Sequence, residues 1–304
     1  MSALVKACIK GNLDRCRYLV DHGFRECLYD LYDPYECPLL IIAVENEHFE
    51  IVKWLVEMGC DVREKDRLGI TPMYSACLVS LTLAKWFFEM GAAADIRTPS
   101  RFGNTPLYAA CESGNLETAQ WLYQMGAADI HTKDLSGSTP MNAACAAGKL
   151  ATAKWLAAQG ADIHVTDTLG WTPLVTACYY GHLDVVKWLV GLGADVKTKC
   201  PYNYIYPDFT PLKAASRGDV IYWLVLNGAV TGADGHANPT LVPSSIVGTL
   251  RAKVRSHDVF VRYVFKLLRG RRALVLVADF LGLLRGRALR TAREILNIPS
   301  QKSK

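Results

Sequence analysis

Ten cysteines and seven histidines are the residues of this chain that could support metal binding, disulfide formation or nucleophilic catalysis. No two cysteines have the Cys-x-x-Cys spacing of a zinc site or a redox pair. Five cysteines instead occupy one position of a repeated pattern: Cys8, Cys77, Cys111, Cys145 and Cys178. A small apolar thiol suits a buried position, so we interpret these cysteines as core residues of a reduced intracellular protein.

The histidines give no better case for chemistry. His131 and His164 occupy equivalent positions of the pattern, but the sequence around them supplies no further metal ligands. The sequence also lacks the G-x-S-x-G, H-E-x-x-H, Walker and dinucleotide-binding motifs. We therefore predict no catalytic residues, no metal and no cofactor, and we expect the chain not to be an enzyme.

The pattern that positions these residues is a pair of helices. In its clearest copy Thr105 suits a helix N-cap, Pro106 the first helical position and Gly114 the left-handed residue that ends a helix. An apolar second helix containing Trp121 follows. Matching Thr-Pro pairs begin at residues 71, 105, 139 and 172, separated by 34, 34 and 33 residues. Such a period is typical of a solenoid of stacked helical pairs.

The motifs TPMYSA, TPLYAA, TPMNAA and TPLVTA at these four positions resemble the signature of the ankyrin-repeat family. The resemblance extends over about residues 2–230. It implies an all-α solenoid of about seven helix-turn-helix units with β-hairpin-like fingers, followed by a helical C-terminal segment. It also implies a scaffold or adaptor that binds a partner protein through its fingers and concave face, and does no catalysis.

Two sets of residues are candidate contacts for that partner. The first is the tyrosines of two lengthened fingers: Tyr29, Tyr32, Tyr35, Tyr202, Tyr204 and Tyr206. Tyrosine suits recognition because it offers a rigid ring with a polar end, although these rings could equally pack on their own fingers. The second set lies on the first helices at or near the position of the family's histidine: Tyr74, Tyr108, Asn142, Tyr179 and Lys213.

A third candidate is a row along the fingers. Each Asp-Ile or Asp-Val pair is followed by a cationic or titratable residue: Arg63, Arg97, His131, His164 and Lys197. Stacked repeats would align these side chains, and the row could meet an acidic segment of a partner. The alternative is that they are simply solvated.

One aromatic residue recurs in each second helix: Trp54, Trp86, Trp121, Trp155, Trp188 and Trp223. An exposed row of tryptophans would form a binding platform. Because the position lies within the apolar face of the helix, we predict instead that these rings belong to the core.

The C-terminal segment differs in charge from the rest of the chain. Residues 251–304 hold 14 Lys/Arg and 3 Asp/Glu, whereas residues 1–250 hold 20 and 26. Ten of the basic residues are candidate contacts: Arg251, Arg255, Arg262, Lys266, Arg269, Arg271, Arg272, Arg285, Arg287 and Arg290. The segment could bind nucleic acid, anionic membrane or a second protein such as a ubiquitin-ligase component, or it could cap the last repeat.

The sequence predicts three parts: an ankyrin-repeat domain over residues 1–230 with atypical first and last repeats, a linker over 231–245 and a basic helical tail over 246–304, docked as a cap. We see no signal peptide and no apolar run of the ~20 residues that a membrane span requires. These observations lead us to expect a monomeric cytoplasmic or nuclear protein.

Overall fold

The computed structural model describes residues 3–24, 28, 31–32, 37–126, 129–200, 209–227 and 229. The chain divides into two compact units, Met1–Pro173 and Leu174–Lys304. The predicted linker and basic tail lie outside the described residues, so the proposed domain boundaries there stay predictions.

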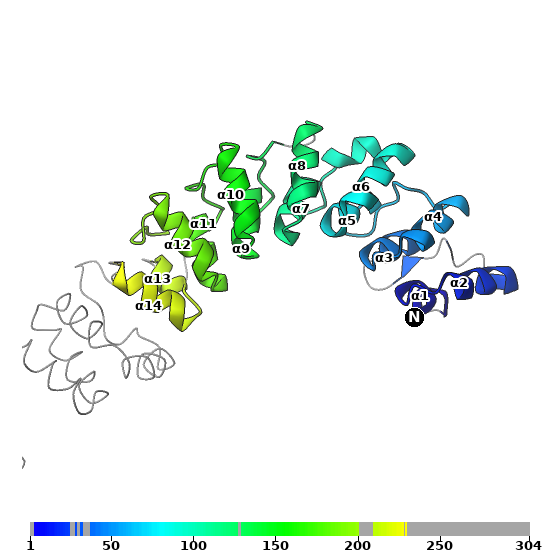
Figure 1. Cartoon of the computed structure of the whole chain (residues 1–304), viewed down its shortest axis with the longest axis horizontal. Helices are drawn as coiled ribbons and strands as arrows, with labels where there is room; N and C mark the ends of the chain where they lie inside the picture. Colours follow the sequence, from blue (N-terminus) through cyan, green and yellow to red (C-terminus); the bar gives the residue numbers. More distant parts are fainter. Residues whose placement is uncertain are drawn as a thin grey trace, which may run out of the picture. The chain divides into compact units, whose positions relative to one another are not determined.

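The first unit consists of five helix pairs that lie side by side in chain order (Figure 1). The first helices of the pairs are α1 (Ala3–Ile9), α3 (Leu39–Glu45), α5 (Pro72–Val79), α7 (Pro106–Ser113) and α9 (Pro140–Ala146). The second helices are α2 (Leu13–Leu19), α4 (Phe49–Glu57), α6 (Leu81–Phe87), α8 (Leu116–Gln124) and α10 (Leu150–Ala158). Each first helix contacts the first helix of the next pair, which confirms the predicted repeat fold.

The described residues of the second unit form two more pairs. Helix α11 (Pro173–Tyr180) begins at the boundary and is followed by α12 (Leu183–Gly191), α13 (Pro211–Ala214) and α14 (Gly218–Leu226). Helix α14 packs on α12 and α13, and the Ser216 N–H donates to the Cys178 carbonyl at 3.3 Å. With only four residues, α13 is much shorter than its eight-residue counterpart α7.

The Thr-Pro pairs start first helices as predicted. The hydroxyl oxygens of Thr71 and Thr105 accept the N–H groups of Tyr74 and Tyr108 at 3.1 and 3.2 Å. The following proline occupies the first helical position, where no N–H is needed. Gly114 then ends α7 with a φ of 81°, and its N–H donates to the Ala110 carbonyl.

One connection departs from this scheme because its sequence lacks the glycine. Between α5 and α6, Ser80 alone makes the turn in an extended conformation, with φ −154° and ψ 127°. Its N–H donates to the Ala76 carbonyl at 2.8 Å, so the end of α5 is still capped.

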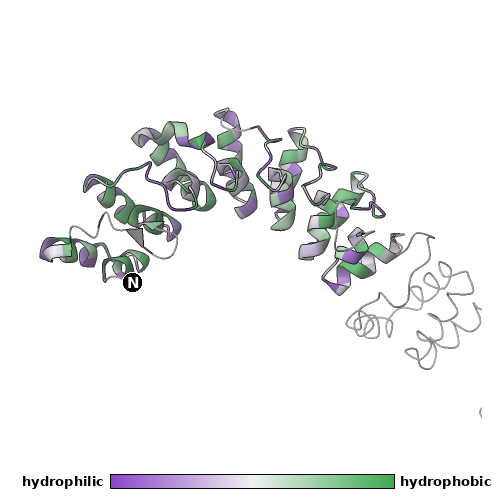
Figure 2. Ribbon diagram, turned by 180° about the vertical axis from the view of Figure 1, so that it is seen from behind, coloured by the Kyte–Doolittle hydropathy of each residue, from purple (hydrophilic) through white to green (hydrophobic). Residues whose placement is uncertain are grey.

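The core lies between the first helices and the inner sides of the second helices. In α7, Leu107, Ala109, Ala110 and Cys111 are fully buried. The small size of Ala109, Ala110 and Cys111 lets neighbouring helices approach closely, and α7 contacts both α5 and α9. Figure 2 shows apolar residues concentrated on the helices and hydrophilic ones along the segments that connect the pairs.

The predicted position of the tryptophans in the core is only partly correct. Trp54 is buried, but the remaining tryptophans are partly exposed. Three of them pack edge-to-face on an aromatic ring of the preceding repeat: Trp86 on Phe49, Trp121 on Phe88 and Trp155 on Tyr123, with centroids 5.7, 5.7 and 5.8 Å apart. The row therefore joins successive second helices along their outer edge.

The cysteines of the repeated position are free and buried, as predicted. Burial raises the pKa of the Cys145 and Cys178 thiols to about 12. Burial likewise raises the pKa of Cys77 and Cys111. A thiol that stays protonated is a poor nucleophile and a poor metal ligand, which supports a packing role.

Candidate functional site

Four fingers of the first unit lie over residues 61–70, 95–104, 129–138 and 162–171, after the second helices α4, α6, α8 and α10. Each finger ends in a tight turn that begins at Asp66, Ser100, Asp134 or Asp167 and contains a glycine three residues later. The Asp134 carboxylate accepts the N–H groups of Ser136 and Ser138 at 2.9 and 2.8 Å. Side chain and backbone together therefore fix the shape of the turn.

The fingertip turns are joined to one another by backbone hydrogen bonds. The Arg101 N–H donates to the Leu68 carbonyl at 2.7 Å, Leu135 to Phe102 at 2.9 Å, and Thr168 to Ser136 at 2.9 Å. The glycine of the turn is required for this approach. At Gly137, φ is 77° and an added Cβ would lie 3.0 Å from the Thr168 nitrogen. The four tips therefore form a continuous ladder.

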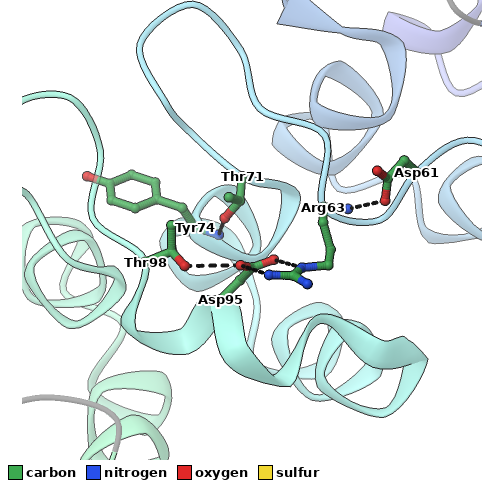
Figure 3. Close-up of polar contacts among 6 residues, drawn as sticks. All are labelled: Asp61, Arg63, Thr71, Tyr74, Asp95 and Thr98. Atoms are coloured by element: carbon green, nitrogen blue, oxygen red, sulfur yellow. Dashed lines mark hydrogen bonds and ion pairs between the residues drawn. The ribbon is translucent and has the colours of Figure 1, made fainter.

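An ion pair ties the first finger to the second (Figure 3). The Arg63 Nε and Nη2 donate to the Asp95 carboxylate at 3.1 and 3.2 Å. The same carboxylate accepts the Thr98 hydroxyl at 3.0 Å. Asp95 lies in the 3₁₀ helix η4 (Ala93–Arg97) and is only 1% exposed, and the carboxylate raises the pKa of Arg63.

The predicted row along the fingers is therefore heterogeneous. The Arg63 side chain binds Asp95, and the Arg97 Nη2 donates to the Gly126 carbonyl at 2.7 Å. His131, His164 and Lys197 have exposed side chains. Their backbone N–H groups donate at 2.8 Å to the aspartate two residues earlier. Arginine holds successive repeats together, whereas the side chains of the two histidines of the first unit extend into solvent.

Two of the first-helix candidates are buried, which contradicts their prediction as surface contacts. Tyr74 is 5% exposed and Asn142 is 2% exposed. Burial raises the pKa of the Tyr74 phenol. Tyr108 and Lys213 are partly exposed, whereas Tyr179 is 46% exposed and packs edge-to-face on Tyr180 at 5.2 Å.

Comparison with known proteins agrees with this geometry. The family model of ankyrin repeats, described as three copies, matches residues 1–66, 40–134, 72–167 and 126–200. The chain belongs to the ankyrin-repeat family. Proteins built from these repeats generally mediate protein–protein interactions and are typically non-enzymatic.

Solved ankyrin structures are also similar. The ankyrin repeat domain of human ASB11 is 24% identical with a TM-score of 0.55, and the match covers 76% of this chain and 100% of that one. The ankyrin repeat domain of Bcl-3, described as a unique member of the IkappaB protein family, is 28% identical with a TM-score of 0.48, covering 74% and 98%. No curated protein sequence matches the chain. The ASB11 likeness supports the ankyrin fold.

Several candidate contacts of the ankyrin domain lie outside the described residues or have side chains that are not described. In the first lengthened finger, the short strands β1 (Leu31–Tyr32) and β2 (Cys37–Pro38) pair antiparallel, which places only the Tyr32 backbone. Tyr29, Tyr35, Tyr202, Tyr204, Tyr206 and every basic residue of the tail fall outside the described ranges. Their roles stay predictions.

The ankyrin fingertips carry exposed apolar residues that the sequence reasoning missed. Phe102, Leu135 and Leu169 are 55%, 75% and 51% exposed. The signal was present in the sequence: each of them lies one or two residues before a glycine that recurs every 33 or 34 residues, at Gly103, Gly137 and Gly170. Leu68, one residue before Gly69 in the first finger, is less exposed than these three.

Within the described part of the ankyrin chain, no cluster of three or more His, Cys, Asp or Glu could hold a metal ion. Over the same residues, no helix is both long and apolar enough to cross a membrane.

Proposed function

We propose that this chain is a non-enzymatic scaffold that binds a partner protein through the ankyrin fingers and the C-terminal ends of the first helices. The observation that carries the proposal is chemical variation at solvent-facing positions of a constant frame. The same helix position holds Glu45, Leu78, Glu112 and Ala146 in successive repeats. Around Leu78, Glu112 and Ala146 the capping threonine and the buried cysteine recur, whereas the repeat of Glu45 has Pro38 and Val44 at these positions.

This variation supports recognition because folding alone would accept many polar residues at each of these positions. A frame held by burial and capping keeps the variable side chains at fixed places, which lowers the entropy lost on binding. The fingertip ladder does the same for the fingers. A surface that is ordered before the partner arrives suits a scaffold.

The test is capture of partner proteins by the immobilised full chain, quantified by mass spectrometry. The test variant combines Glu112→Ala, His131→Ala and His164→Ala, all at exposed positions. The control combines Lys85→Ala, Glu117→Ala and Lys154→Ala, which are exposed on second helices. We expect the test variant to lose most of the proteins that wild type enriches, with an unchanged Tm.

The control variant should retain these proteins. The proposal fails if the second-helix control loses them while the test variant keeps them. It also fails if wild type enriches no protein above a bare support.

A further inference from the structure

The outer face of the first three fingers is basic, although the residues before the tail are acidic overall, and the fourth finger has no Lys or Arg. Exposed and less exposed residues alternate along the first finger, as expected of extended chain. Over the four fingers the exposed positions include six lysines and arginines: Arg63, Lys65, Arg67, Arg97, Arg101 and Lys133. Only three exposed aspartates accompany them. We use the name outer finger face for all exposed positions of the four fingers, which include the apolar fingertip residues Phe102, Leu135 and Leu169.

The three aspartates lie at the start of their fingers and are engaged locally. Asp61, Asp129 and Asp162 each accept the N–H group of the residue two positions later, at 2.9, 2.8 and 2.8 Å. The fourth aspartate in this position, Asp95, is buried beneath Arg63. The exposed Lys and Arg residues therefore lie beyond these aspartates in the first three fingers, with the half-exposed Glu64, Asp66 and Asp134 among them.

Apolar side chains adjoin this charge. Phe102 and Leu135 occupy neighbouring fingertips, because the Leu135 N–H donates to the Phe102 carbonyl at 2.9 Å. Arg101 precedes Phe102 directly, and Lys133 lies two residues before Leu135. Lys133 also donates to the Thr166 carbonyl at 3.1 Å, which holds its side chain against the next finger. Exposed aromatic and aliphatic groups beside fixed cations are typical of binding surfaces.

We propose that the outer finger face binds an extended acidic segment of the partner protein that carries large apolar side chains. Carboxylates of the segment would lie over Lys65 and Arg101, and its apolar groups would cover Phe102 and Leu135. Charge complementarity selects this occupant. Elsewhere in residues 1–250 the acidic residues outnumber the basic ones, so other surfaces would repel the same acidic segment. This inference rests on the proposed scaffold function and specifies the chemistry of its partner.

The ladder and the interrepeat bonds explain why such a surface can be selective. Arg63, Arg97 and Lys133 each reach a group of the following repeat, so the spacing of the charged fingers is set before binding. A partner segment then loses entropy only on its own side.

The probe is a library of random peptides displayed on phage and selected on the immobilised full chain at low salt. We expect the enriched peptides to be rich in Asp and Glu and to contain Leu, Ile or Phe. Their affinity should fall steeply as salt rises toward about 1 M, where charges are screened within about 3 Å. Basic or neutral peptides, or no enrichment above a bare support, would overturn the proposal.

Two variants locate the peptides on the structure. Lys65→Ser with Arg101→Ser should weaken the selected peptides about threefold to tenfold, since each exposed charge contributes up to about 1 kcal/mol. The matched control, Lys85→Ser with Lys154→Ser, removes the same charge from exposed second-helix positions and should have little effect. Equal losses of peptide affinity in both variants would show that the interaction depends only on the net charge of the chain, and would refute the assignment to the fingers.

A third variant separates the apolar contribution. Phe102→Ser with Leu135→Ser should leave the preference for acidic residues in the selected peptides but remove their preference for apolar residues.

The broader scaffold function is judged separately. If the peptides are not acidic, yet protein capture still depends on Glu112, His131 and His164, the scaffold stands and only the acidic occupant is rejected.

Discussion

The helix pairs and the fingers repeat with the same period but are stabilised in different ways. The pairs depend on volume: Leu107 and Cys111 are fully buried, and the small alanines between them let neighbouring helices touch. The fingers depend on polar geometry: Asp134 accepts the turn N–H groups, and Gly137 allows the next tip to approach. The helical frame therefore constrains side-chain size, whereas a finger constrains its turn residues and the side chains that bind the next repeat, such as Arg63 and Arg97.

The largest effect should come from removing apolar volume in the frame. Leu107→Ala in α7 deletes a fully buried side chain and should lower the free energy of unfolding by about 2–5 kcal/mol. Phe102→Ala removes a larger but exposed side chain and should change it by less than about 0.5 kcal/mol. Urea unfolding of both variants measures the contrast. Similar losses in the two variants would show that the fingertips contribute to the core.

The fingertip ladder should be the weak point of the fingers. Gly137→Ala places a side chain at positive φ and 3.0 Å from the Thr168 nitrogen, and should cost about 1–3 kcal/mol. Gly160→Ala is the matched control, because its φ is also positive, at 92°, but nothing lies within 4 Å of the added Cβ. The excess loss at Gly137 measures the close approach alone. Equal losses would mean that backbone strain accounts for the whole effect and that the close approach at Gly137 adds no cost.

The ion pair between fingers should matter to a similar or smaller degree. Asp95→Asn keeps the shape of a buried side chain but removes the charge that Arg63 and Thr98 contact, and should cost about 1–3 kcal/mol. Adding Arg63→Gln to this variant should cause little further loss, because the two residues act on the same interaction. Additive losses in thermal or urea unfolding would indicate that Arg63 has a separate stabilising role.

These contrasts also explain which parts of the fold and of the candidate site could be predicted from the sequence. Local signals were sufficient for the helix pairs, because a capping threonine, a proline and a terminal glycine act within one helix. The interrepeat contacts were not predicted, since Arg63 and Asp95 are 32 residues apart and neither residue type indicates the pairing. Tyr74 and Asn142 were misplaced because a pattern of variable residues does not reveal which of them are buried.

The fingertips and the tryptophans show the same limit. The sequence prediction did not include the fingertip turns, and the structure shows that the backbones of Leu135 and Phe102 are hydrogen-bonded there and that both side chains are exposed. The apolar face of a second helix is wide enough to include an outer edge. The predicted core position was therefore correct for Trp54 and incorrect for Trp121, which is partly exposed beside Phe88.

The smallest expected effect is a difference in how the free energy of unfolding depends on pH, which a buried thiol of the frame should alter and a fingertip residue should not. The unfolded Cys145 thiol loses its proton near the ordinary pKa of 9.0, whereas burial in α9 keeps the folded thiol protonated up to about 12. Between these values the unfolded state binds fewer protons than the folded state. The free energy of unfolding therefore falls as pH rises, by about 1.4 kcal/mol per pH unit for a single thiol, and this contribution is intact below pH 9.

Urea unfolding of wild type and Cys145→Ala between about pH 8 and about pH 10 measures that slope. Tyrosines and lysines titrate in both proteins, so the difference between the two curves isolates the thiol. We expect Cys145→Ala to lose less stability at alkaline pH than wild type. Phe102→Ala, whose changed side chain does not titrate and lies on a fingertip, should follow the wild-type slope. Parallel curves for wild type and Cys145→Ala would mean that the α9 thiol is reachable by water in the folded state, and that the frame is less tightly packed than its burial indicates.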